Sequence, residues 1–136
     1  MFGIIIIHIL TNDIMHICQK NFKSNVQKEK ELYDFVYNFN TTIIQTASAR
    51  PNIQFFISLC LPRYDQKDQI GMLSGRDIVN REIYNTLWHI NNITLVNNEN
   101  FSQMDFGQDF YHLNPFGFSK LLSNWKNAIG KEISKS

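Results

Sequence analysis

The sequence has little cysteine. Only 2 of its 136 residues are Cys, namely Cys18 and Cys60. Two such residues cannot make a disulfide framework, and they lack the spacing and the His or Cys neighbours of a zinc site. We therefore expect a reduced, cytoplasmic chain without a structural metal.

An excess of charge and a long apolar run are missing as well. The 13 Lys+Arg and 12 Asp+Glu leave a formal net charge of +1, so electrostatics favours neither nucleic acid nor an anionic membrane as a partner. The apolar run Ile4–Ile7 follows Met1 without a basic region and is far too short to span a bilayer. We expect no signal peptide, no transmembrane segment and no membrane partner.

The amino-acid composition is typical of a globular chain. Hydrophobic residues make up 43% and aromatic residues 13% of the sequence, and the length is that of one domain, residues 1–136. Three apolar runs rich in β-branched residues predict strands, and three segments with apolar residues at helical spacing predict helices. The strands are expected at Phe2–Leu10, Ile53–Leu61 and Ile93–Val96, and the helices at Gln27–Ser48, Arg76–Ile90 and Pro115–Ile133.

The alternation of these elements predicts an α/β fold. We expect a three-layer parallel sheet of about three strands with helices on both faces, and the first strand is patterned for burial on both faces. Sites in such sheets form at the C-terminal ends of the strands. Those ends carry a polar loop at residues 11–13, the segment Leu61–Arg63 and residues 97–101. The turn that contains His112 follows the third strand, so we expect Asn12 and His112 to lie at the same edge of the sheet. The segment Arg63–Gly75 is expected to be a polar loop, in which Arg63 is either solvated or binds an anionic group.

The segment before the last helix carries the clearest chemistry. Asp109 precedes His112 by three residues, so its carboxylate can accept the Nδ1–H of the imidazole and leave Nε2 free as a general base. Asn114 suits the N-cap of the helix and Pro115 its first position. An ordinary surface histidine beside a helix cap would have the same pattern.

Two blocks of the chain resemble those of the SGNH (GDSL-type) hydrolases, a family of esterases and lipases on a flavodoxin-like sheet. Leu10-Thr11-Asn12-Asp13 is similar to the family's Gly-x-Asn-Asp block, and Asp109-Phe110-Tyr111-His112 to its Asp-x-x-His block. Leu61-Pro62-Arg63 looks most like an animal subgroup that includes esterase-like domains of retroelements. The resemblance covers the whole chain but only the C-terminal part of the family's domain.

By this resemblance His112 would be the general base, and Asp109 would orient it. Asn12 would donate its side-chain amide to the oxyanion. The substrate would be a small ester, hydrolysed through an acyl-serine without cofactor or metal. Supporting roles would fall to Thr11, Asp13 and Asn114.

The nucleophile that the family requires is missing from these residues. There is no Gly-Asp-Ser block and no counterpart of the family's second block, and Leu10 replaces the glycine of the Asn-Asp block. We therefore expect a truncated domain that is inactive alone. Its first strand would expose an edge and self-associate.

Other interpretations stay open. The chain could be a non-catalytic pseudoenzyme or interaction module on the same fold, or an active esterase whose first part is absent from the sequence. Cys18 or Cys60 could act as the nucleophile in place of serine. A metal site is also conceivable from Asp13, His16, Asp109 and His112, although their spacing is not specific.

Overall fold

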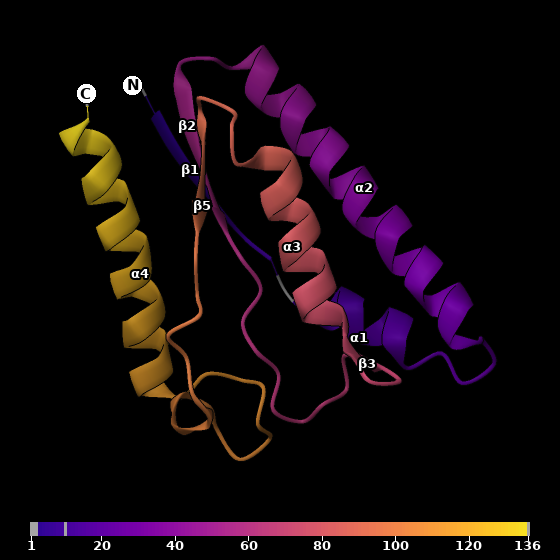
Figure 1. Cartoon of the computed structure of the whole chain (residues 1–136). Coiled ribbons are helices and arrows are strands. Elements are labelled where there is room, and N and C mark those ends of the chain that lie inside the picture. The colour runs from indigo at the N-terminus through magenta and orange to yellow at the C-terminus, as the bar shows by residue number, and fades with distance from the viewer. Residues whose placement is uncertain (1–2, 10, 136) are drawn as a thin grey trace.

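The fold is a three-layer α/β arrangement built on a parallel sheet. The computed structural model describes residues 3–9 and 11–135. The strands β1 (Gly3–His8), β2 (Ile53–Ser58) and β5 (Ile93–Val96) pair in the order β1-β2-β5, all parallel. Figure 1 shows α4 (Pro115–Ser134) on one face, and α1 (Asn12–Cys18), α2 (Asn25–Ala49) and α3 (Gly75–Leu87) on the other. The predicted α/β class, with a parallel sheet between helices, is confirmed.

Side-chain caps start the three long helices. Ser24 accepts a hydrogen bond from the backbone N–H of Gln27, whose side chain accepts one from the backbone N–H of Ser24, so the two form a capping box for α2. Ser74 caps α3. Asn114 caps α4 and Pro115 occupies its first position, as predicted. Local sequence therefore accounts for where these helices begin.

A short helix, α1, stands where the sequence predicted a polar loop. Thr11 is its N-cap and Asn12 its first residue. Ile14, Ile17 and Cys18 lie on one side of this helix and are buried, because their spacing puts them on a common face. The prediction of a loop was wrong because the apolar periodicity begins only after the polar residues and lasts for barely two turns.

β1 lies at an edge of the sheet. The prediction from its sequence, a strand buried on both faces, was wrong. Within the described residues it pairs only with β2, and Ile4, Ile5 and Ile6 are 41%, 40% and 37% exposed. β2, which has a strand on each side, is almost entirely buried. A β-branched run is covered only where neighbours flank it, so the same pattern has opposite outcomes in β1 and β2. The predicted strand ends, Phe2 and Leu10, lie outside the described residues.

The segment before α3, predicted as an irregular polar loop, contains a hairpin of β3 (Gln69–Ile70) and β4 (Leu73–Ser74). Gly71 turns this hairpin with a φ of +60°, a conformation that favours glycine. Asp68 is buried, and its carbonyl oxygen accepts a hydrogen bond from the N–H of Gly75 at 2.7 Å. A Cβ at Gly75 would lie 2.8 Å from that oxygen, so the start of α3 needs a glycine.

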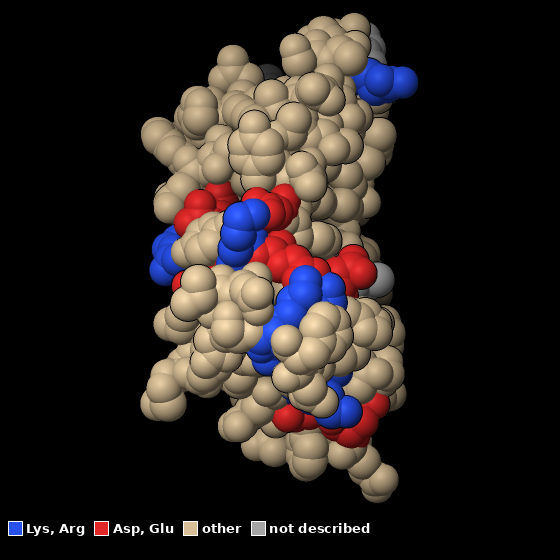
Figure 2. Space-filling model, turned by 90° about the vertical axis from the view of Figure 1, so that its right-hand side faces the viewer, with Lys and Arg blue, Asp and Glu red and all other residues tan. Residues whose placement is uncertain are grey.

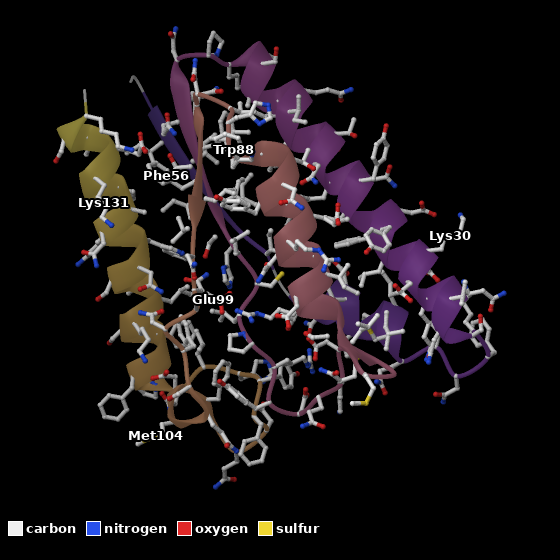
Figure 3. All side chains as sticks on the ribbon, viewed as in Figure 1. Lys30, Phe56, Trp88, Glu99, Met104 and Lys131 are labelled. Atoms are coloured by element: carbon white, nitrogen blue, oxygen red, sulfur yellow. The ribbon has the colours of Figure 1, made fainter. Side chains whose placement is uncertain are left out.

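Two hydrophobic clusters hold the layers together. The larger one fills the space between the sheet and α1, α2 and α3. On the other face, Phe56 lies between the sheet and α4 (Figure 3). A smaller cluster supports the loops that precede α4. It consists of Leu61, Phe101, Phe106 and Leu121.

The contact between α2 and α3 contains a buried polar group. Figure 2 views the molecule from the side of α2, where charges of both signs gather over the middle and lower part. Beneath this surface Asn40 is only 5% exposed. Its Nδ2 donates to the carbonyl oxygen of Glu82 at 3.4 Å, while its Oδ1 has no partner in the described part of the chain. A buried oxygen without a donor destabilises a fold by about 1–3 kcal/mol.

Replacing Asn40 by Leu should raise the free energy of unfolding by about 1 kcal/mol, since the unpartnered oxygen is removed from an apolar contact. Urea denaturation would measure the change. Asn38→Leu, at an exposed position of the same helix, is the control and should change the free energy by less than about 0.5 kcal/mol. A clear loss of stability in Asn40→Leu alone would contradict the prediction.

The exposed edge of β1 should make the chain self-associate, because unpaired backbone groups along an isoleucine-rich strand can pair with a second chain. Ile4→Lys should weaken this association, which sedimentation over a range of concentrations would measure. Ile133→Lys adds the same charge at an exposed position of α4 and should leave the association unchanged. A wild-type chain that stays monomeric at high concentration would refute the expectation.

Candidate functional site

A pocket of about 330 Å³ lies at the C-terminal edge of the sheet. This is the end of the molecule where Glu99 and Met104 are labelled in Figure 3. Asn12 and His112 both line it, so the expectation that these distant residues share one edge of the sheet is confirmed. Most of the remaining lining is apolar and comes from Ile9, Leu61, Pro62, Leu113, Phe118 and Leu121.

Asp109 and His112 form a hydrogen-bonded pair, as their spacing predicted. The Nδ1 of His112 lies 2.5 Å from Asp109 Oδ2. The other carboxylate oxygen accepts from the backbone N–H groups of His112 at 3.0 Å and Tyr111 at 3.1 Å. The backbone N–H and the imidazole of His112, followed by the N–H of Tyr111, lower the pKa of Asp109 to about 2. The carboxylate is therefore ionised near neutral pH, and it holds a proton on Nδ1 of the imidazole.

The turn that presents this pair is strained and anchored at both ends. Phe110, between the two residues, has a φ of +64°, a left-handed conformation that is costly for a residue with a large side chain. The N–H of Gly107 donates to the carbonyl oxygen of His112 at 2.8 Å. Beyond the turn, a Cβ at Gly117 would lie 2.2 Å from the carbonyl oxygen of Asp105. The first turn of α4 can therefore pack this closely only because residue 117 is glycine.

Asn12 lies at the start of α1 with its side chain tied on one side. Its Oδ1 accepts a hydrogen bond from Nη1 of Arg63 at 3.4 Å, and Thr11 Oγ1 accepts from the same nitrogen at 3.4 Å. The amide Nδ2 of Asn12 has no partner among the residues described. The geometry therefore leaves an N–H donor on Asn12. Asp13, in the first turn of α1, is exposed and lines no part of the pocket.

Arg63 is neither solvated nor available to bind an anion, so both sequence-based expectations for it are wrong. Its side chain is only 1% exposed, and its guanidinium makes two hydrogen bonds of 2.8 Å to Asp65. The guanidinium carbon lies 3.9 Å from the centre of the Tyr111 ring. The Tyr111 ring centre is in turn 3.9 Å from that of His112. Arg63 thus links the Asn12 side of the pocket to the dyad, a role for which the sequence carries no signal.

A second histidine, His8, reaches the pocket from the end of β1. Its Nδ1 lies 2.8 Å from the hydroxyl of Ser58, which is completely buried at the end of β2. The Ser58 oxygen also accepts hydrogen bonds from Asn98 Nδ2 and Trp125 Nε1, each at 2.9 Å. Sequence reasoning missed this group because its members come from four separate segments.

None of the candidate nucleophiles is set against His112. The hydroxyl of Ser58 is sealed and hydrogen-bonded. Burial raises the pKa of Cys18 to about 11 and that of Cys60 to about 12, so both thiols stay protonated and unreactive near neutral pH. In the described residues no group of three or more His, Cys, Asp or Glu side chains could hold a metal ion.

Arg63→Lys should lower the free energy of unfolding by about 2 kcal/mol, because lysine cannot reproduce the paired contact with Asp65 or the stacking on Tyr111. Chemical denaturation would measure the loss. Arg81→Lys is the matched control, since the Arg81 side chain is 58% exposed, and it should change stability by less than about 0.5 kcal/mol. Equal effects of the two substitutions would show that the buried guanidinium has no special role.

Comparison with known proteins finds no match among family models, curated proteins or solved structures. In the described part of the chain no helix is both long and apolar enough to cross a membrane. The resemblance to SGNH hydrolases therefore stays a prediction, and the geometry of the pocket is the basis for any functional conclusion.

Proposed function

We propose that the chain is an SGNH-type ester hydrolase domain that holds the base and the oxyanion donor of the site but no nucleophile. One observation carries the proposal. Asn12 and His112 come from opposite ends of the sequence and line one pocket at the carboxyl ends of the strands, with Asp109 bonded to His112. These are the residue types that acyl transfer needs, at the edge of the sheet where such sites form.

The proposed chemistry assigns one task to each group. Asp109 holds a proton on Nδ1 of His112, which leaves Nε2 to take the proton of an attacking serine and return it to the leaving alcohol. The Asn12 amide donates to the oxyanion of the tetrahedral intermediate. The acyl group is held on the serine between the two half-reactions, and neither a metal nor an organic cofactor is required.

The nucleophile is the part that these residues do not supply. The Gly-Asp-Ser block of the family is absent from the sequence, and the buried Ser and Cys side chains near the sheet are hydrogen-bonded or protonated. The free edge of β1 ends at the pocket, where His8 lines it. A strand that paired with this edge in the parallel direction of the sheet would carry its own C-terminal loop to the same pocket. A serine on such a loop could face His112.

A non-catalytic binding module is the second candidate. It is favoured by the exposure of the His112 side chain, which is 68%, and by the packing of the tilted Tyr111 ring against the imidazole. Water competes with substrate at so open a base, whereas the apolar lining of the pocket would still bind a small ligand. The two candidates differ in whether adding a nucleophile creates activity.

The test starts with the purified chain and short p-nitrophenyl esters. We expect no burst and no turnover above a background of free imidazole, because no serine or thiol of the described residues is hydrogen-bonded to the His112 ring. A burst of p-nitrophenol that disappears on mutating one Ser or Cys would contradict this expectation and identify the nucleophile.

The second arm adds a strand-Gly-Asp-Ser-helix-strand segment from a related esterase ahead of residue 1. Activity should then appear, and it should be lost in His112→Ala and when the added serine is replaced by alanine. His16→Ala, at an exposed histidine of α1, is the matched control and should retain activity. A folded chimera without activity would favour the binding module.

A further inference from the structure

The hydrogen atoms around Ser58 can be assigned from its partners. The indole nitrogen of Trp125 can only donate, so it donates to the Ser58 oxygen. Asn98 is oriented by its other contacts, since its Oδ1 accepts from Asn124 Nδ2 at 3.0 Å and its Nδ2 donates to the carbonyl oxygen of Leu59 at 2.7 Å. Its Nδ2 therefore donates to Ser58 as well. With both lone pairs of the hydroxyl occupied, the Ser58 O–H donates to Nδ1 of His8.

This assignment fixes the tautomer of His8. A ring whose Nδ1 accepts a hydrogen bond carries its proton on Nε2 when it is neutral. Burial lowers the pKa of His8, so the ring stays neutral below the pH at which an exposed histidine becomes charged. The edge-on contact with Trp125, whose ring centre is 5.9 Å away, helps to hold the plane of the ring.

The Nε2–H of His8 is available to a ligand. Within the described residues the ring makes one side-chain hydrogen bond, through Nδ1 with Ser58, and none through Nε2. In the described residues, two side-chain polar atoms are both buried and without a hydrogen-bond partner, namely Asn40 Oδ1 and Asp68 Oδ1. Because His8 Nε2 lacks a partner and is not one of these two atoms, it is accessible to solvent. His8 lines the pocket that Asn12 and His112 share. The pocket therefore has N–H groups on His8 and Asn12 and a bare imidazole nitrogen on His112.

The rest of the pocket restricts what can bind there. Among the described residues that line it there is no Lys or Arg. The nearby guanidinium of Arg63 is paired with Asp65, and the ionised Asp109 lies beside His112. This field disfavours a carboxylate or a phosphate. The volume of about 330 Å³ is at the lower end for small-molecule sites. An uncharged ligand with one hydrogen-bond acceptor and a short apolar chain satisfies both conditions.

We propose that the Ser58–His8 pair makes His8 a fixed N–H donor for the carbonyl oxygen of an uncharged acyl ligand, whose short apolar chain lies against Leu61, Leu113 and Leu121. The inference rests on the proposed function and names the substrate class of that site. Ser58 is a positioning residue, because it acts through the tautomer of His8. The donor is neutral, so it adds no positive charge that would attract a competing carboxylate into the pocket.

The experiment uses the full chain and hexanamide. This amide is a neutral acyl probe, and it is not hydrolysed at a measurable rate. Long-range ¹H–¹⁵N spectra of the imidazoles should show His8 as the Nε2–H tautomer, and titration with hexanamide should shift its Nε2–H signal. Hexanoate, with the same chain and a negative charge, should bind at least about tenfold more weakly. Absence of hexanamide binding would overturn the inference.

Matched variants separate the donor from the fold. His8→Phe should weaken hexanamide binding about tenfold, the loss expected for one hydrogen bond to a ligand. His8→Gln, whose side-chain amide can present an N–H near the same position, should restore most of it. His89→Phe changes an exposed histidine beside Trp88, at the opposite end of the molecule in Figure 3, and should have no effect. Equal binding by wild type and His8→Phe would refute the role of His8.

Ser58→Ala tests the positioning role through the tautomer of His8, which a change in stability alone would not alter. The variant should populate the Nδ1–H tautomer of His8, even where the chain remains folded, and a spectrum unchanged from wild type would refute the assignment. Failure of this inference is distinguishable from failure of the proposed function. If Asn12→Ala and His112→Ala weaken hexanamide binding but His8→Phe does not, only this inference fails. If binding depends on His8 while the folded chimera stays inactive, the hydrolase proposal fails instead.

Discussion

The parallel pairing of β1 and β5 on the two sides of β2 is the constraint on which the rest of the structure depends. Because the three strands run in one direction, their carboxyl ends meet at a single edge, and the segments that leave them converge there. The segment between β5 and α4 reaches this edge on the face of the sheet that α4 covers, where the small cluster around Phe101 and Phe106 supports it. Polar groups from both ends of the sequence therefore share one pocket.

The two histidines of that pocket are held by opposite means. His112 is exposed and bonded to a carboxylate, which keeps a proton on Nδ1 and leaves Nε2 as an acceptor. His8 is partly buried and its Nδ1 accepts a hydrogen bond from a hydroxyl, which leaves Nδ1 without a proton and puts the proton on Nε2. A pocket that offers a base on one side and a neutral donor on the other suits a polarised carbonyl group better than a charged ligand.

The contacts of Arg63 connect the two sides of the pocket to each other. Its charge is neutralised by Asp65, and its flat guanidinium packs against Tyr111, whose ring in turn packs against His112 at a tilt. The same guanidinium donates to Asn12 and Thr11. A buried cation held on so many sides costs less to desolvate than an unpaired one. The order it imposes extends from α1 to the turn before α4.

The sequence by itself determined the α/β class, the position of most elements and the Asp109–His112 pair. These features depend on local patterns: apolar periodicity, the cap formed by Asn114 and Pro115, and a spacing of three residues that lets a carboxylate reach a ring. Only the tertiary structure decided that β1 is an edge, that Arg63 is buried, and that Ser58 orients His8. Each of these outcomes depends on which distant segments meet in space, and the sequence of any one segment does not encode its neighbours.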